Sequence, residues 1–557
     1  MYRAHAVNQA YASLRDCRAC FFGPVVLHDF RLWGLILIFS SLFFAKRKFL
    51  RAVATSSVIL FSFAYFVDIV VFLTFTHQRL IYANALRYMD FRVWRYFLRS
   101  PENGWFFLLY AAPFAIGTLA LGLSRGLGPR KLGLGVIAFG LVVSGLGMLP
   151  IRFEDPLAAQ ARNFIEANRM RGDLVPYSSS FLQASSTLFS GPEGPFQAGL
   201  SQKKDVIILF VESLSSYQSR FFSAIRDYTP HLDEIARDHT AFVNFHANSY
   251  YSTAGRVSLF AGIPGLPGQS GIPVLDNVIA QESLFSIFKK NGFGTQVFYA
   301  GLPNIDSFGH YMRQLGADHF SDSTDPFYRD SARYIFGSIT DRLLYENVLR
   351  SLREPRSKEP LFIVAVTASS HQPFQNPETG AKGQEAAFRY ADAQIYDFYQ
   401  ALRKLKFFDH GMLLITGDHH AMSPVTDEER ARFGAHAGSM VPLVIVESQD
   451  PLPKVIRTPF QQADLLNSFN YLTSQRFCPA PYRGNLFTGK QAPCLFHTEA
   501  DLPDSVAVFC GERTAVVYLD GDATRVVSGS LTGYPKALAH LNYERTRHDN
   551  HSACLGH

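Results

Sequence analysis

Several common signals are missing from this 557-residue chain. The sequence has no dense stripe of basic residues interleaved with aromatics, and its formal net charge is only +6, so we expect no nucleic acid among its partners. Cys17 and Cys20 form a Cys-x-x-Cys pair, but no second pair follows at zinc-finger spacing, which argues against a zinc module there. No small-residue cleavage site follows the first apolar run, so a cleavable signal peptide does not fit.

Long apolar runs are instead concentrated in the first 151 residues. A helix needs about 20 mostly apolar residues to cross a bilayer. We therefore predict a transmembrane helix bundle over residues 1–151, with four spans, or five if an irregular segment near Cys20–Leu27 also crosses. The four segments are Leu32–Ala45 with an N-terminal extension, Ala52–Phe75, Trp105–Leu123 and Leu132–Ile151.

Basic residues between these segments predict the orientation. One cluster, Lys46 to Arg51, separates the first two spans, and a second, Arg125 to Lys131, separates the last two. The positive-inside rule places both short loops in the cytoplasm. The fourth span then leads outward, so the rest of the chain is predicted to be extracytoplasmic.

The remainder divides into three predicted parts. Residues 152–203 indicate a linker with helical pieces, because Ser, Gly and Pro cluster there. Residues 204–510 have the composition of an α/β catalytic domain. Residues 511–557 are predicted to form a strand pair, Ala515–Leu519 with Thr524–Ser528, followed by a polar tail.

Cys478 and Cys494 bracket a loop and are candidates for a disulfide in an oxidising compartment.

Within residues 204–510, polar residues follow apolar strand-like runs. Val206–Val211 ends in Glu212, and Met412–Ile415 leads to Asp418 and His419. Strands alternating with helices predict a mostly parallel sheet flanked by helices, and ligands gather at the carboxyl ends of such strands. Carboxylates and imidazole together suit Mn²⁺, Zn²⁺ or Mg²⁺.

Two further strand-like runs lead to candidate substrate-binding residues. Leu361–Val366 precedes His371, and Gly294–Tyr299 precedes His310 and Arg313. His436, just before another apolar run, is a further candidate. These side chains are suited to binding an anion or to acid–base work.

The segment 228–262 is expected to run helix, strand, loop, helix, with Ser252 and Thr253 where the last helix begins. A hydroxyl there meets free backbone N–H groups and the positive end of a helix dipole, where anions bind. The alternative is that Ser252 only caps the helix. With a metal held by Glu212, Asp418 and His419, the hydroxyl becomes a nucleophile toward phosphorus or sulfur.

These motifs, in this order, resemble the alkaline phosphatase/sulfatase superfamily, and more closely the membrane-anchored lipoteichoic acid synthases and phosphoglycerol transferases. The segment from Ser252 to Gly262 is similar to the signature C/S-x-P-S-R-x-x-L-x-x-G, SSHQPF to S-x-H-x-P-F, and TGDHH to the metal motif. The resemblance implies Ser252 as nucleophile, with Thr253 as the fallback. It implies that the metal is bound by Glu212, Ser252, Asp418 and His419, and the substrate by Arg256 and His371, with His310, Arg313 and His436 as further candidates.

The resemblance implies a metal-dependent transferase, with Mn²⁺ preferred over Zn²⁺ and Mg²⁺. Such an enzyme moves a phosphoglycerol-type group from a membrane phospholipid to an envelope glycan or glycolipid through a covalent Ser/Thr intermediate. The implied location is the bacterial inner membrane, multi-pass, with the catalytic domain on the periplasmic side. The alternatives are a phosphoethanolamine transferase acting on lipid A or a glycan, a phosphodiesterase or sulfatase-type hydrolase, and an inert envelope scaffold.

Overall fold

The computed structural model describes Phe49, Val53 and residues 204–529, apart from 265–282, 304–307, 355–358, 373, 448–453, 475–483, 499–504 and 521–522. The chain separates into two units, Met1–Glu166 and Ala167–His557, and the elements described below belong to the second. Apart from Phe49 and Val53, which are helical, the predicted transmembrane bundle lies outside the described residues, as do the linker and the polar tail. None of the helices within the described ranges combines the length and apolar character that crossing a bilayer requires.

A mostly parallel sheet forms the centre of this unit, as predicted. Nine of the described strands build it in the order β4-β3-β5-β1-β6-β7-β2-β8, with β9 also pairing with β2. β7 runs antiparallel to both of its neighbours, and the other pairs are parallel. The strands are β1 Asp205–Val211, β2 Thr240–His246, β3 Gly294–Tyr299, β4 His319–Ser321, β5 Leu361–Val366, β6 Gly411–Gly417, β7 Met440–Glu447, β8 Val455–Ile456 and β9 Phe460–Gln461.

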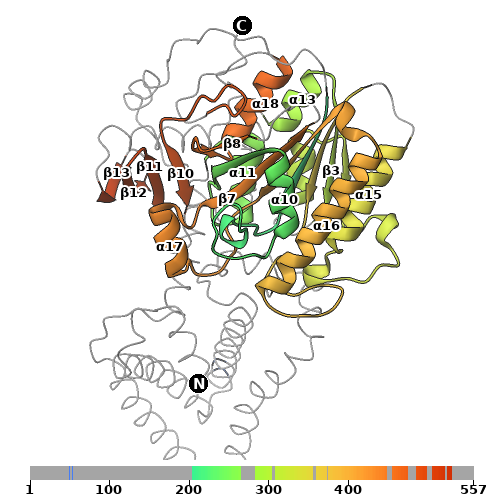
Figure 1. The fold of residues 1–557 in the computed structure, drawn as a ribbon, viewed down its shortest axis with the longest axis horizontal. Helices are drawn as coiled ribbons and strands as arrows, with labels where there is room; N and C mark the ends of the chain where they lie inside the picture. Colours follow the sequence, from blue (N-terminus) through green and yellow to red (C-terminus); the bar gives the residue numbers. More distant parts are fainter. Residues whose placement is uncertain are drawn as a thin grey trace, which may run out of the picture. The chain divides into compact units, whose positions relative to one another are not determined.

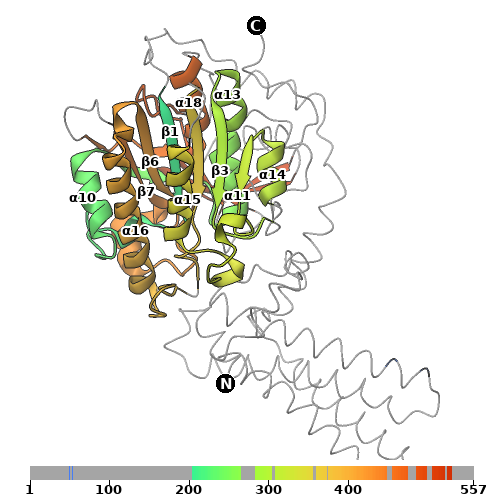
Figure 2. The ribbon, with the colours of Figure 1, turned by 90° about the vertical axis from the view of Figure 1, so that its right-hand side faces the viewer.

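Helices cover both faces of the sheet, so the central strands are apolar on both sides. In β1, Val206, Ile208 and Phe210 pack into one core, while Ile207, Leu209 and Val211 pack into the other. Figure 2 shows α10, α15 and α16 together on one side of the sheet and α11, α13 and α18 on the other. The helices are α10 Pro230–Asp238, α11 Ser252–Ala261, α13 Leu284–Lys290, α14 Phe308–Gln314, α15 Asp341–Arg353, α16 Gln384–Lys404, α17 Asp427–Phe433 and α18 Asp464–Ser474.

A second, antiparallel sheet follows in the order β10-β11-β12-β13 (Figure 1). Its strands are β10 Leu495–Thr498, β11 Ser505–Cys510, β12 Arg513–Asp520 and β13 Ala523–Gly529. β12 and β13 pair where the strand pair was expected, and the boundary predicted after residue 510 falls inside this sheet. The expected Cys478–Cys494 disulfide is corrected: Cys494 bonds to Cys510, because pairing of β10 with β11 brings these two strand ends together.

Candidate active site

The strand order brings the predicted acidic and imidazole groups to one edge of the sheet. β1 lies between β5 and β6, all three parallel, with Val211 opposite Gly417. Glu212 therefore emerges beside Thr367 and Asp418, and its N–H donates to the Thr367 hydroxyl at 2.9 Å. Gly417 has a steric role in this arrangement, because a side chain there would collide with the Leu214 carbonyl.

Glu212, Asp418 and His419 form a compact, buried cluster whose ligand atoms all lie within 4.8 Å of one another. His419 Nε2 is 3.3 Å from Asp418 Oδ2 and 3.6 Å from Glu212 Oε1. His419 Nδ1 donates to the backbone carbonyl of His420 at 2.8 Å. In the neutral ring, Nε2 therefore carries the lone pair that a metal needs, and it faces both carboxylates.

The hydrogen bonds of Asp418 leave one carboxylate oxygen for another purpose. Oδ1 accepts from the backbone N–H groups of Ser213 and His419 at 2.8 and 2.9 Å. Oδ2 is buried and has no hydrogen-bond partner among the described residues. A buried polar atom is normally paired. The bare oxygen, together with the lone pair of His419, fits a divalent cation bound at this point.

The electrostatics of the two carboxyl groups agree with that fit. Burial, reinforced by the charge of Glu212, raises the pKa of Asp418 to about 7. Burial alone would also raise the pKa of Glu212, but His371, His419 and the Ser213 hydroxyl together hold it below its ordinary value. The charge of one carboxylate thus keeps a proton on the other, and a bound cation would replace that proton.

Ser252 presents its hydroxyl to the same cluster. It is the first residue of α11, and Tyr251, not Ser252, occupies the N-cap position, so the alternative of a simple cap does not describe it. Ser252 Oγ lies 2.7 Å from His419 Nε2, and the residue is only half-buried. A reactant could therefore reach the hydroxyl. Thr253 is the second residue of α11.

One glutamine joins the segment before Ser252 to the metal-site loop. The Gln462 side chain accepts from the N–H of Asn248 at 3.2 Å and donates to the carbonyls of Gly417 and Asp418 at 3.0 and 2.7 Å. All four residues are buried. The amide therefore fixes the position of the segment before Ser252 relative to Asp418.

The second sheet holds the same segment from the other side. β10 pairs with it through Thr498, whose N–H donates to the Asn248 carbonyl and whose carbonyl accepts from the Tyr250 N–H, both at 3.0 Å. The Thr498 hydroxyl also donates to the Ser249 hydroxyl. His497, the preceding residue, is buried and donates from Nδ1 to the Ala247 carbonyl at 2.8 Å. Residues 247–250 are thus fixed on both sides before Ser252.

Arg256 lies one turn after Ser252 on α11 and is buried. Its guanidinium carbon is 4.3 Å from the centre of the Phe308 ring and 5.7 Å from that of Tyr299. Its charge helps to lower the pKa of Glu212. The apolar face of α14, which carries Phe308, therefore holds a positive charge beside the acidic cluster.

The other predicted substrate-binding residues differ in their positions. His371 follows β5, donates from Nδ1 to the Gln372 carbonyl at 2.7 Å, and lies close enough to Glu212 to lower the pKa of that carboxyl. His310 and Arg313 lie on the exposed side of α14. The guanidinium of Arg313 packs over the Phe320 ring at 5.6 Å.

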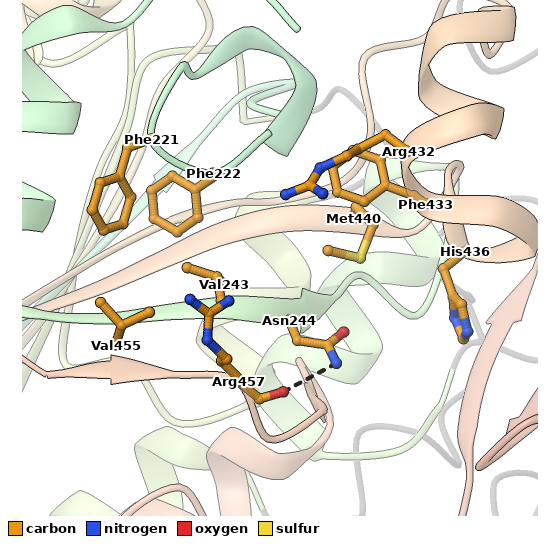
Figure 3. Close-up of a pocket in the computed structure, with 10 residues that line it drawn as sticks. All are labelled: Phe221, Phe222, Val243, Asn244, Arg432, Phe433, His436, Met440, Val455 and Arg457. Carbon is orange, nitrogen blue, oxygen red and sulfur yellow. Dashed lines mark hydrogen bonds between the residues drawn. The ribbon is translucent and has the colours of Figure 1, made fainter. Parts of the chain in front are cut away.

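His436 ends a 3₁₀ turn before β7, and its ring centre is 5.1 Å from that of His246 and 4.3 Å from that of Phe509. It also lines a pocket of about 430 Å³, shown in Figure 3. Within the described part of the chain, the contacts of His310, Arg313 and His436 do not include the three residues of the acidic cluster.

Reasoning from the sequence missed some residues of the site. Gln462, Asn248 and His497 are single polar residues outside any motif, and the one signal for Gln462 is its place just after β9. His420 is buried, and its Nε2 hydrogen-bonds to Glu429 at 2.6 Å. Burial is the main cause that lowers the pKa of His497 to about 4, and the nearby His420 and His419 add to it. The hydrogen bond to the Ala247 carbonyl acts in the opposite direction and raises this pKa.

Comparison with known proteins identifies the domain that carries this site. Residues 204–474 match the sulfatase family model, of the alkaline phosphatase superfamily. One relative that this domain resembles in sequence is the lipoteichoic acid synthase of Staphylococcus aureus, at 20% identity over 247 residues. That match covers 41% of this chain and 38% of the synthase, so it spans well under half the length of the relative.

A solved structure shares the fold. An alkaline phosphatase superfamily protein from Vibrio parahaemolyticus superimposes with a TM-score of 0.52 at 19% identity, over 68% of this chain and 94% of that one. A lipoteichoic acid synthase from Listeria monocytogenes gives a TM-score of 0.49 at 16% identity, over 69% of this chain and 96% of that one.

Proposed function

We propose that this protein is a metal-dependent transferase that moves a phosphoglycerol-type group from a membrane phospholipid to an envelope glycan or glycolipid. The observation that carries the proposal is the position of the Ser252 hydroxyl, 2.7 Å from His419 Nε2 in a buried cluster with Glu212 and Asp418. The similarity of the domain to a lipoteichoic acid synthase supports this choice of transferred group.

Glu212, Asp418 and His419 would hold the metal, with the Ser252 hydroxyl as a fourth ligand, and Mn²⁺ is our first choice over Zn²⁺ and Mg²⁺. When bound there, a divalent cation lowers the pKa of a serine hydroxyl and offsets the negative charge of a phosphate. The residues around the cluster supply the remaining requirements, which are orientation, charge and access.

The reaction divides into two displacements at phosphorus. Ser252 Oγ forms a bond to the phosphorus of the donor, the bond from phosphorus to the diacylglycerol oxygen breaks, and the serine proton passes to that oxygen. In the second step an acceptor hydroxyl bonds to the phosphorus, the bond to Oγ breaks, and the acceptor proton returns to Ser252. A covalent intermediate replaces one difficult displacement with two easier ones.

Arg256 and His371 are proposed to bind the phosphoryl oxygens. Both act electrostatically on Glu212, so both lie near the place where the anion would sit. Positive groups that are held in place before the reaction stabilise the negative charge that develops on the phosphoryl oxygens. His310, Arg313 and His436 are proposed to contact more distant parts of the substrates.

The proposal also places the protein in the membrane. A lipid donor must be reached at the bilayer surface, and the predicted spans in residues 1–151 would hold the domain there. We propose a multi-pass protein of the bacterial inner membrane with its catalytic domain on the periplasmic side.

A donor assay tests the proposal. Full-length protein in detergent with Mn²⁺ is given phosphatidylglycerol or phosphatidylethanolamine, each labelled in the headgroup, together with a glycolipid acceptor. We expect labelled glycerol phosphate on the acceptor and release of diacylglycerol. Transfer from phosphatidylethanolamine alone would overturn the choice of group in favour of a phosphoethanolamine transferase. Release of the headgroup to water without transfer would indicate a hydrolase.

A further inference from the structure

The turn after β1 contains a strained residue that contacts both carboxylates of the acidic cluster. Ser213 is fully buried, and its backbone φ is 60°. This left-handed conformation is unfavourable for a residue with a side chain, and it persists only where the surrounding structure imposes it. The contacts of Ser213 show what imposes it here.

The left-handed conformation directs two hydrogen-bond donors of one residue into the cluster. The Ser213 hydroxyl donates to Glu212 Oε1 at 2.9 Å, and the Ser213 N–H donates to Asp418 Oδ1 at 2.8 Å. Consecutive side chains of a regular strand point to opposite faces of the sheet. Extended backbone at this point would therefore turn the hydroxyl away from the Glu212 carboxylate, and the left-handed turn brings it back.

The rest of the turn is bonded to the loop that carries Asp418. The Ser213 carbonyl accepts from the Ser215 hydroxyl at 3.2 Å, and that hydroxyl accepts from the Ala421 N–H at 2.7 Å. The Gln218 side chain accepts from the Ser215 N–H at 2.9 Å, and all of these residues are buried. Ser213 thus cannot leave its strained conformation without breaking bonds to both carboxylates and to Ser215.

The two donors of Ser213 also orient the carboxylate oxygens. Asp418 Oδ1 is taken by the N–H groups of Ser213 and His419, which leaves Oδ2, without a hydrogen-bond partner among the described residues, for a cation. At Glu212, the oxygen bound by Ser213 is the one that lies 3.6 Å from His419 Nε2. One residue therefore orients both acidic groups of the cluster.

We infer that Ser213 is a positioning residue of the metal site, which holds Glu212 and Asp418 in the arrangement that a divalent cation requires. The inference rests on the metal site of the proposed function. Ligands that must be ordered when a cation binds lower its affinity, because the ordering costs conformational freedom. Groups that hydrogen-bond to metal ligands remove that cost, and their loss typically weakens metal binding by about 10- to 100-fold.

Metal binding to the stripped protein tests the inference. Full-length protein in detergent is treated with EDTA, freed of the chelator and titrated with Mn²⁺ in a calorimeter. We expect Ser213→Ala, which removes only the hydroxyl, to bind Mn²⁺ about tenfold more weakly than the wild type, or weaker still. Ser213→Gly removes the same hydroxyl and also relieves the backbone strain. It should lose at least as much affinity while melting no lower than Ser213→Ala, and it decides the test if Ser213→Ala does not fold.

Two variants outside the site are the matched controls. Ser223→Ala removes another buried serine hydroxyl, one that donates to the Ser219 carbonyl at 2.8 Å. Ala224→Gly relieves the same kind of strain at an exposed residue with a φ of 63°. Both should bind Mn²⁺ within about twofold of the wild type. Affinities in the Ser213 variants equal to those of the controls would overturn the inference.

Saturating Mn²⁺ separates positioning from a direct part in the transfer. A residue that only arranges the carboxylates for binding matters little once the cation is bound. Excess Mn²⁺ should therefore restore the kcat of Ser213→Ala to within about fivefold of the wild type, with the donor KM unchanged. A larger loss of kcat at saturating Mn²⁺ would overturn the assignment of Ser213 as a positioning residue.

Failure of the inference and failure of the proposed function give different results. If the wild type binds Mn²⁺ but transfers no lipid headgroup, the proposed function fails, and weaker Mn²⁺ binding by the Ser213 variants still supports the inference. If transfer occurs and the variants bind Mn²⁺ as tightly as the wild type, the inference alone fails. If the wild type binds no Mn²⁺, both fail.

Discussion

The Ser252 hydroxyl and the imidazole of His419 meet at 2.7 Å, although 167 positions separate the two residues in the chain. Serine stands at the start of α11 and histidine just beyond β6. Three structural features hold them in this relation: the strand order, the amide of Gln462, and the pairing of β10 with the segment before Ser252. Each can be tested separately.

Ser252→Ala should abolish transfer. Without Oγ no covalent intermediate forms, so we expect kcat/KM to fall by roughly a thousandfold or more. Thr253→Ala should retain activity within about fivefold, because Thr253 is the fallback nucleophile and not the first. Release of diacylglycerol measures both variants, and mass spectrometry of a quenched reaction should find the phosphoryl group on Ser252. Loss of activity in Thr253→Ala with activity retained in Ser252→Ala would reverse the assignment.

Gln462→Leu should reduce kcat by more than the accompanying loss of folding stability can explain. Loss of the amide leaves the Asn248 N–H and the carbonyls of Gly417 and Asp418 without their partner, at a cost of about 1–3 kcal/mol in stability. A small displacement of the nucleophile can cost about a hundredfold in rate, so we expect kcat to fall at least tenfold while the donor KM changes little.

Asn347→Leu is the matched control for Gln462→Leu. Asn347 is buried and its amide bonds to Ser321, Tyr328 and Arg350, none of which belongs to the acidic cluster. It should destabilise the protein to a similar extent without changing kcat by more than about twofold. Equal losses of kcat in the two variants would show that Gln462 has only a structural role.

The sequence predicted the parts of this site that follow strands and missed the parts that hold them together. Glu212 and Asp418 could be predicted because an apolar run in the sequence shows where a buried strand ends, and ligands gather at the carboxyl ends of such strands. The adjacency of β5, β1 and β6 is a matter of topology, which no local pattern encodes. Gln462 and Thr498 act through bonds to backbone groups of distant segments, and such bonds impose no spacing that can be recognised in a sequence. The Cys494–Cys510 pair likewise depends on the pairing of β10 with β11.

Metal binding should weaken as the pH falls below about 7. Burial and the charge of Glu212 raise the pKa of Asp418 to about 7 in the metal-free site, so below that pH a cation must displace a proton. We expect the affinity for Mn²⁺ to fall about fivefold between pH 7 and 6, to approach a loss of about tenfold per pH unit below pH 6, and to level off above pH 8. Calorimetric titration at several pH values measures this, and an affinity that is constant from pH 6 to 8 would contradict it. Chelation with EDTA should abolish transfer at every pH.

Asp341→Asn should stabilise the protein at neutral pH. Asp341 is buried at the start of α15, where Oδ1 accepts from the N–H groups of Ala368 and Ser369. Burial raises its pKa to about 6 from 3.8. The folded state therefore holds the proton more tightly than the unfolded state, and stability is lost as the pH rises from about 4 to about 6.

The gain in Asp341→Asn should thus be near zero at pH 4 and reach at most about 3 kcal/mol above pH 7, since one pKa unit corresponds to about 1.4 kcal/mol. The asparagine keeps the accepting oxygen and removes the charge. Melting temperatures of wild type and variant across this range measure the difference, with the exposed Asp330→Asn as the control. A difference that does not grow with pH would refute the assignment of this pKa.

The pairing of β10 with residues 248–250 has a consequence for how the protein is made. Thr498 bonds to Ser249 across 249 positions of the chain, and the disulfide that ties β10 to β11 needs Cys510 as well. During translation, Ser252 is added to the growing chain long before β10, the strand that holds the segment before Ser252 in place. The segment before Ser252 therefore lacks its partner on β10 until synthesis has passed residue 498, and the disulfide that ties β10 to β11 cannot form before residue 510 is made.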